Sequence, residues 1–275
     1  MAAPRAFSRL TSRQHALVSA CRDLARGRGE SGAVLLDGAH VIAEALASDV
    51  PIDAAIVSAD LLADDGPHGR RLVEALHRHG TTVYEGTDDV IAAASPVRTP
   101  AGLVAIARWS PATIAATLAP PPSLTIGLVG VQDPGNLGAA IRSADALGAT
   151  GVIGIDDAAN PSGWKAIRGS MGSTFHLPVA RAGFADVVAH ARSTGVQIVA
   201  AVARSGRAPE SVPFTNQTII LLGSEGAGLG DDYLPTDAIP VTLAMRHGVE
   251  SLNVAVAAAL LLYEAARQRA AGRHS

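Results

Sequence analysis

The strongest fold signal in the chain is the stretch HGVESLNVAVAAALLLYEAARQR, residues 247–269. Residues 254–263 are apolar on nearly every side, which predicts a buried helix that begins near Asn253. Ser251 and Asn253 stand directly in front of this helix. One such side chain is enough to cap a helix, because it accepts hydrogen bonds from the first free N–H groups. Two of them indicate that this loop also has a functional role.

The bulk composition favours an ordinary globular protein of one large or two modest domains. The chain has 275 residues and 48% hydrophobic residues, enough for a substantial core. A formal net charge of −3 argues against a uniformly basic nucleic-acid binder but is compatible with a local basic patch. One cysteine, Cys21, excludes an internal disulfide. No apolar run reaches the roughly 20 residues of a membrane span, so we expect a soluble cytoplasmic protein without membrane contact.

The clearest break along the chain is the proline run at residues 119–123, which predicts a stiff linker. We therefore expect a first domain at residues 1–118 and a second domain at residues 124–275. In the first domain, the pattern predicts helices at residues 14–25, 39–47 and 70–79 and strands at residues 33–37, 54–58, 82–85 and 103–107. This alternation predicts an α/β fold.

The second domain shows the same alternation with stronger strands. Residues 125–131 are almost continuously apolar, which is typical of a parallel strand covered on both faces. Further strands are predicted at residues 152–155, 197–203, 218–223 and 239–243, with helices at residues 137–147 and from residue 253 onward. The second domain is thus expected to contain a parallel sheet.

The loop at residues 132–138 is the first of three that could carry chemistry. A strand ends, a glycine-rich turn follows, and the next helix carries Arg142. Helix N-termini bind anions through free N–H groups, although this loop matches neither nucleotide-binding fingerprint. The alternative is a plain turn in which Asn136 caps the helix and Arg142 is a surface ion-pair partner.

The second such loop, residues 221–230, places glycines around the single carboxylate Glu225. Glycine permits positive φ angles and close approach of a ligand to the backbone, but a flexible turn with a solvated carboxylate is the alternative. The third loop leads from the strand at residues 239–243 to Asn253. All three loops follow strands, so a parallel sheet would bring them to its carboxyl edge, where α/β proteins bind ligands. No HExxH, CxxC or G-x-S-x-G pattern occurs, so we expect neither a metal site nor a hydrolase triad.

The ordered combination of the three loops closely resembles the SpoU/TrmH family of RNA ribose 2′-O-methyltransferases, part of the SPOUT superfamily. The motifs are N-x-G-x-x-x-R at residues 136–142, L-x-G-S-E-G-x-G ending at Gly228, and G-V-E-S-L-N-V at residues 248–254. Residues 166–172 resemble a further family segment. Residues 11–13, 37–46 and 99–104 more weakly resemble the family's small ribosomal-protein-like substrate-binding domain.

The resemblance implies a C-terminal SPOUT domain with a deep trefoil knot, S-adenosylmethionine bound in a bent form, and an obligate homodimer. It implies five catalytic residues, namely Asn136, Arg142, Glu225, Ser251 and Asn253. It implies five cofactor-binding residues, namely Leu222, Gly223, Leu243, Met245 and Leu252. One departure is visible, because the family commonly reads I-P-M where this chain has Leu243-Ala244-Met245. A missing proline could loosen that loop.

The activity that the resemblance implies is methyl transfer from S-adenosylmethionine to a ribose 2′-hydroxyl, in ribosomal RNA by analogy. The alternatives are the same chemistry on tRNA and a non-catalytic RNA- or cofactor-binding protein. The resemblance also implies Arg142 as the general base. Because a guanidinium keeps its protons in proteins, the identity of the base stays open. Candidates for phosphate contacts are Arg5, Arg9, Arg13, Arg22, Arg26, Arg28, Arg108, Arg168 and Arg246. For the N-terminal arginines, a merely solvated basic helix is the alternative.

Overall fold

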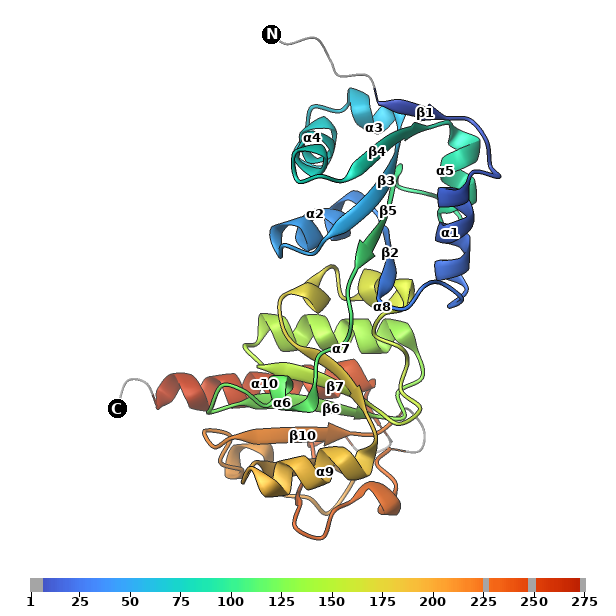
Figure 1. Cartoon of the computed structure of the whole chain (residues 1–275). Coiled ribbons are helices and arrows are strands. Elements are labelled where there is room, and N and C mark those ends of the chain that lie inside the picture. Colours follow the sequence, from blue (N-terminus) through green and yellow to red (C-terminus); the bar gives the residue numbers. More distant parts are fainter. Residues whose placement is uncertain (1–6, 225–227, 247–250, 273–275) are drawn as a thin grey trace. The chain divides into compact units, whose positions relative to one another are not determined.

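The computed structural model describes residues 7–224, 228–246 and 251–272, and the chain forms two compact units (Figure 1). The first unit comprises Met1–Ser110 together with Ser162–Phe175, and the second comprises Pro111–Pro161 together with His176–Ser275. The expected division at residues 119–123 therefore lies elsewhere in the structure. In the described part of the chain, no helix is both long and apolar enough to span a membrane.

The first unit is built on a five-stranded mixed sheet. Its strands in spatial order are β1 (Ser8–Leu10), β4 (Thr82–Gly86), β3 (Ile52–Ser58), β5 (Leu103–Arg108) and β2 (Ala33–Asp37). β1, β4 and β3 are mutually parallel, whereas β5 runs antiparallel to both β3 and β2. The four predicted strands of this unit are confirmed within two residues, and the short edge strand β1 was not predicted.

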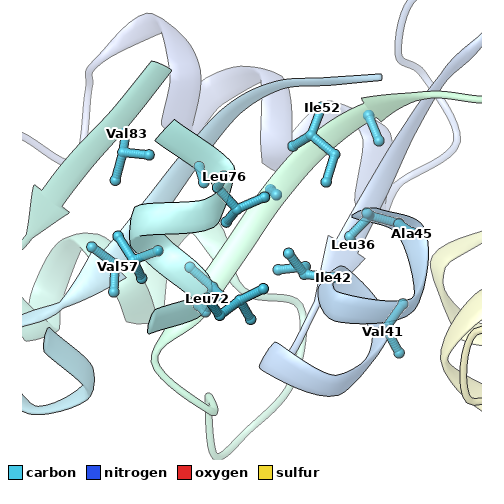
Figure 2. Close-up of a cluster of buried hydrophobic side chains, with 14 of the residues drawn as sticks. Leu36, Val41, Ile42, Ala45, Ile52, Val57, Leu72, Leu76 and Val83 are labelled. Carbon is cyan, nitrogen blue, oxygen red and sulfur yellow. The ribbon is translucent and has the colours of Figure 1, made fainter. Parts of the chain in front are cut away.

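Helices cover both faces of this sheet. They are α1 (Ala16–Ala25), α2 (Ala39–Ala47), α3 (Ala59–Ala63), α4 (Arg70–Arg78) and α5 (Asp88–Ala94). Figure 2 shows the cluster of buried side chains on one face, to which α2 contributes Ile42, α4 contributes Leu76 and β2 contributes Leu36. On the other face, Cys21 of α1 and Ile91 of α5 belong to a separate apolar cluster with Leu35. Successive residues of a strand, such as Leu35 and Leu36, thus pack into opposite layers, because side chains alternate between the two faces of a strand.

The segment Ser162–Phe175 packs within the first unit, although the sequence places it inside the second domain. It contains α8 (Trp164–Gly169) and the 3₁₀ turn η1 (Ser173–Phe175). Ile167 is buried in the cluster around α2, while the indole N–H of Trp164 donates to the carbonyl of Ala25 at 3.2 Å. At Gly172, an added Cβ would lie 2.5 Å from Cβ of Glu44 on α2. The segment is therefore packed against both helical layers of the first unit, although in the sequence it lies between two strands of the second unit.

The second unit is built on a six-stranded sheet, all of whose pairs are parallel. Its strands in spatial order are β11 (Ile239–Val241), β9 (Gln197–Ala201), β10 (Thr218–Leu222), β6 (Leu124–Val129), β7 (Gly151–Ile155) and β8 (Val179–Ala182). The predicted parallel sheet is confirmed. β8 was not predicted.

The helices of this unit form layers on both sides of the sheet. They are α6 (Ile114–Thr117), α7 (Pro134–Ala146), α9 (Phe184–Ser193) and α10 (Val254–Ala271), with 3₁₀ turns η2 (Pro209–Ser211) and η3 (Asp231–Tyr233). α7 and α10 pack against each other, and Figure 1 shows α9 on the opposite side of the strands. Val187 of α9 and Ile219 of β10 share an apolar cluster on that side, which Ile114 of α6 also contacts.

Residues 111–118 belong to the second unit, so the chain leaves the first unit before the proline run. The carbonyl of Thr117 accepts hydrogen bonds from the hydroxyls of Thr125 at 2.6 Å and Thr150 at 3.1 Å. The proline run is itself held, because the Arg269 guanidinium of α10 donates to the carbonyl of Pro122 at 2.7 Å. These bonds make the run part of the second unit rather than a free linker.

Candidate functional site

A cavity of about 260 Å³ lies at the carboxyl ends of β9, β10 and β11, beside the start of α10. All five residues expected to bind a cofactor line it, namely Leu222, Gly223, Leu243, Met245 and Leu252. They come from three separate stretches of the chain that the parallel sheet brings to one edge. This edge is where open α/β sheets bind their ligands.

The cavity wall is apolar, with hydroxyl groups as its polar side chains. Val202 and Leu229 extend the aliphatic surface, and Ser224 and Ser251 contribute hydroxyls. None of the described lining residues is ionisable. A ligand here is therefore recognised through shape, apolar contact and backbone groups. Sequence reasoning missed the contribution of Val202, because β9 reaches the cavity only through its place between β10 and β11.

The loop after β10 folds back tightly on itself. Ser224 and Gly228 form an antiparallel bridge, and the N–H of Gly228 donates to the carbonyl of Ser224 at 2.9 Å. A Cβ at Gly223 would lie 1.9 Å from the carbonyl oxygen of Gly228, so this position accepts only glycine. Close backbone approach is thus built into the cavity wall. Glu225, expected to be catalytic, lies outside the described residues.

The start of α7 differs from the expected one. The side chain of Asp133 accepts a hydrogen bond from the N–H of Asn136 at 2.9 Å, and Pro134 occupies the first helical turn. Proline is favoured there, since its missing N–H would be unpaired in any case. Asp133 is therefore the cap, and the alternative in which Asn136 caps the helix is wrong. The Asn136 side chain instead meets another helix.

Asn253 connects the starts of α10 and α7. Its Oδ1 accepts hydrogen bonds from the N–H groups of Ala255 at 2.9 Å and Val256 at 3.3 Å. These contacts assign the oxygen and leave the amide nitrogen Nδ2 to donate to Oδ1 of Asn136 at 2.9 Å. Asn253 thus caps the helix and braces a second motif, while Ser251 lines the cavity. The two polar residues before the helix have separate positions.

Arg142 stands apart from this group. It is exposed on α7, six residues beyond Asn136 and hence about 9 Å further along the helix axis. It does not line the cavity, and no described carboxylate forms an ion pair with it. The structure therefore joins Asn136 to Asn253 and places Ser251 in the cavity wall, whereas Arg142 is exposed on α7.

Tyr233 anchors the loop that follows Gly228, and nothing in the sequence pattern pointed to it. Its ring packs edge-on against Phe184 with centroids 4.9 Å apart. A hydrogen bond from its hydroxyl to the carboxylate of Asp156 raises the pKa of Tyr233. Asp156 also accepts from the N–H of Phe184 at 3.0 Å. The loop is thereby tied to the end of β7 and the start of α9.

The parallel sheet and the apolar cavity at its carboxyl edge define a ligand-binding domain of the parallel α/β class. Residues 123–263 match the SpoU rRNA Methylase family, and residues 22–105 match the MRM3-like substrate binding domain. The chain therefore belongs to the SpoU rRNA methylase family. The second match identifies the N-terminal region as a substrate-binding domain of the type found in this family.

Known relatives cover almost the whole chain. An uncharacterized tRNA/rRNA methyltransferase of Synechocystis is 32% identical over 94% of both chains. The 23S rRNA (guanosine(2553)-2′-O)-methyltransferase RlmP of Bacillus subtilis is 30% identical over 86% of this chain and 89% of the relative. The crystal structure of an AdoMet-bound rRNA methyltransferase from Sinorhizobium meliloti superposes with a TM-score of 0.82 at 26% identity, covering 95% of this chain and 98% of that one.

Proposed function

We propose that this protein transfers a methyl group from S-adenosylmethionine to the 2′-hydroxyl of a ribose in ribosomal RNA. The observation that carries the proposal is that the second and third motif loops line one apolar cavity, while Asn253 at the end of the third loop donates a hydrogen bond to Asn136 of the first motif. The relative of known activity, RlmP, is named for 2′-O-methylation of 23S rRNA, which favours ribosomal RNA over tRNA.

The cavity suits the cofactor chemically. Leu222, Leu243 and Leu252 offer flat apolar contact for an adenine ring, and the glycine at position 223 allows its backbone to approach closely. The hydroxyls of Ser224 and Ser251 supply polar contacts. When bound, S-adenosylmethionine supplies a methyl carbon on a positively charged sulfur, whose leaving group is a neutral thioether. The protein therefore mainly has to align the ribose oxygen and disperse charge.

The proposed roles of the remaining residues follow from this need. Ser251 and Asn253 hold the third loop, and Asn136 braces it from α7. Arg142 contacts the 2′-oxygen and the adjacent phosphate and stabilises the negative charge that develops, since its guanidinium stays protonated. Glu225 orients Arg142 or the ribose. Correct alignment alone lowers the barrier by about 7–11 kcal/mol.

We propose that two copies of the chain associate through α10. Val256, Leu260 and Tyr263 are 48%, 46% and 62% exposed, and their spacing places them on one side of the helix. Ala255 and Ala258 are buried within the unit instead, so the exposed stripe consists of the larger side chains. Sedimentation equilibrium should show a dimer that Leu260→Glu converts to a monomer. A monomeric wild type would contradict the proposal.

Family membership also supports a deep trefoil knot in the second unit, to which we assign methyl transfer, and we assign RNA recognition to the first unit. A protein that modifies ribosomal RNA works where ribosomes are assembled, which in a bacterium is the cytoplasm. We therefore place it there and assign it no membrane contact.

Mapping of ribose methylation tests the activity. Total RNA from cells with and without the protein should differ at one ribosomal nucleotide, and Arg142→Ala should abolish the difference while calorimetry still detects S-adenosylmethionine binding. A difference confined to tRNA would favour the tRNA alternative. Cofactor binding without any methylated site would favour the non-catalytic alternative.

A further inference from the structure

Six cations of the first unit gather around α8, α1 and the end of α5, although they come from four stretches of sequence. We call them the basic surface, and its members are Arg13, Arg22, Arg26, Arg98, Lys165 and Arg168. Hydrogen bonds and ring contacts connect these stretches in three steps. All of them lie within the first unit.

The first step joins α8 to the end of α1. The indole N–H of Trp164 donates to the carbonyl of Ala25, and the ammonium of Lys165 lies 5.7 Å from the centre of the Trp164 ring. Arg26 follows Ala25 directly and is exposed, as is Lys165. The only lysine of the chain is therefore held next to an exposed arginine that is 139 positions earlier in sequence.

The second step joins α8 to the segment after α5. The carboxylate of Asp37 is 1% exposed, accepts from the Ser95 hydroxyl at 2.6 Å and lies 3.4 Å from Nη1 of Arg168. The Arg168 side chain is itself 45% exposed, so it keeps N–H groups available at the surface. Exposed Arg98 lies three residues after Ser95. The buried carboxylate thus positions one cation and fixes the segment that carries another.

The third step joins the end of α5 to the start of the described chain. Nε of Arg22 donates to the carbonyl of Ala93 at 3.1 Å, and Nη2 of the same side chain donates to the carbonyl of Arg13. Both acceptors are neutral, so the charge of Arg22 is not compensated by these bonds. Arg13 is exposed beside it.

Several other arginines of the first unit are paired with carboxylates. Arg108 is held by Asp53 at 2.6 Å and Glu30 at 3.0 Å, which raises the pKa of its guanidinium and removes it as a strong phosphate candidate. Arg9 and Arg28 have carboxylates at 3.8 Å and 3.7 Å, respectively. Among the described arginines and the lysine of the first unit, those without an ion pair are Arg13, Arg22, Arg26, Arg98 and Lys165 on the basic surface and Arg71 and Arg78 on α4.

Carboxylates lie at the other end of α5. A cavity of about 550 Å³ there is lined by Asp60, Asp64 and Asp88. α5 begins at Asp88 and ends at Ala94, next to the carbonyl that Arg22 contacts. A polyanion is consequently repelled from one end of this unit and attracted to the other.

We propose that the basic surface binds the phosphate backbone of the RNA substrate, and this inference rests on the proposed function. Guanidinium groups match phosphate oxygens in a two-pronged geometry, and several spread over a surface suit a chain of phosphates rather than one small anion. α8 lies within the methylase match at residues 123–263 but adds its cations to the substrate-binding unit. RNA recognition is thus shared between both family regions of the sequence.

Fluorescence anisotropy with the full chain and a labelled RNA hairpin tests the proposal over a range of KCl concentrations. Arg26→Gln/Arg98→Gln removes two exposed cations of the basic surface and leaves Arg22, Asp37 and Arg168 in place. Arg71→Gln/Arg78→Gln is the matched control, since it removes two exposed arginines of α4 in the same unit. Arg26→Lys/Arg98→Lys keeps the charge.

The glutamine variant of the basic surface should bind RNA about tenfold more weakly, with the slope of log affinity against log salt reduced by about two. The α4 control and the lysine variant should retain a slope near that of wild type. Equal losses in both glutamine variants, or none in the first, would overturn the proposal. Wild type that binds an acidic peptide of equal charge but no RNA would overturn it in favour of a protein partner.

Calorimetry with S-adenosylmethionine separates this result from the proposed function. A wild type that methylates rRNA, with an unchanged KM for RNA in the basic-surface variant, contradicts only the inference about the surface. A wild type that binds RNA through the basic surface but neither binds the cofactor nor methylates contradicts only the proposed function.

Discussion

Asn253 donates a 2.9 Å hydrogen bond from Nδ2 to Oδ1 of Asn136, a residue 117 positions earlier in the chain. The same Asn253 side chain caps α10 through its oxygen. The two atoms of one amide therefore have separable roles. The oxygen accepts the hydrogen bonds that cap α10, and the nitrogen donates the hydrogen bond to Asn136. A carboxylate at this position would keep the first task and lose the second.

Asn253→Asp should retain the helix cap, since aspartate caps helices as well as asparagine, but should lose methyl transfer because the donor to Asn136 is gone. Asn253→Ala should lose both, with unfolding free energy lower by about 1 kcal/mol. Turnover and urea unfolding measure the two effects. Wild-type turnover in the Asn253→Asp variant would show that the bond to Asn136 has no role in the reaction.

Gly223→Ala should greatly weaken cofactor binding, because the new Cβ would lie 1.9 Å from the carbonyl oxygen of Gly228 and the loop would have to open. Gly230→Ala in the same loop is the matched control, since an added Cβ there meets nothing within 4 Å. Isothermal titration with S-adenosylmethionine compares them. Equal affinities of the two variants would remove the loop from the cofactor site.

Arg269→Ala should destabilise the second unit by about 2–4 kcal/mol, because charged hydrogen bonds are among the stronger ones. Its guanidinium donates to four backbone carbonyls, those of Pro122, Ser123, Phe214 and Asn216. Burial lowers the pKa of Arg269. Arg267→Ala, which removes an exposed ion pair with Glu264, should cost clearly less stability. Urea unfolding that ranks the two the other way would refute this account.

Tyr233→Phe should weaken cofactor binding severalfold, because the loop loses its hydrogen bond to Asp156. That hydrogen bond raises the pKa of Tyr233. The stability that the bond gives to the loop is therefore fully present below the ordinary tyrosine pKa near 10, and it is lost only as pH rises through the higher pKa of the folded state. The difference between wild type and variant should therefore be constant from about pH 6 to about pH 9. A difference that vanished within this range, or a similar loss in Tyr84→Phe, would contradict it.

Much of the fold could be predicted because local patterns are strong. β2 and α2 begin and end where the periodicity placed them, and the parallel sheet follows from runs such as residues 124–129. Helix α5 was missed although Asp88 and Asp89 mark its first turn, a signal that was available. α9 has a weaker start signal in the sequence, because its N-cap is Gly183 and no side chain caps the helix.

The sequence by itself determined most of the strands and their apolar faces, the motif loops, and the family. Only the tertiary structure decided that residues 162–175 pack with the first unit, that β9 lies between β10 and β11, and that Asn253 meets Asn136 rather than solvent. The physical reason is that periodicity records which face of an element must be covered. Which distant segment covers that face depends on shape and on hydrogen-bond partners that exist only after the chain has folded.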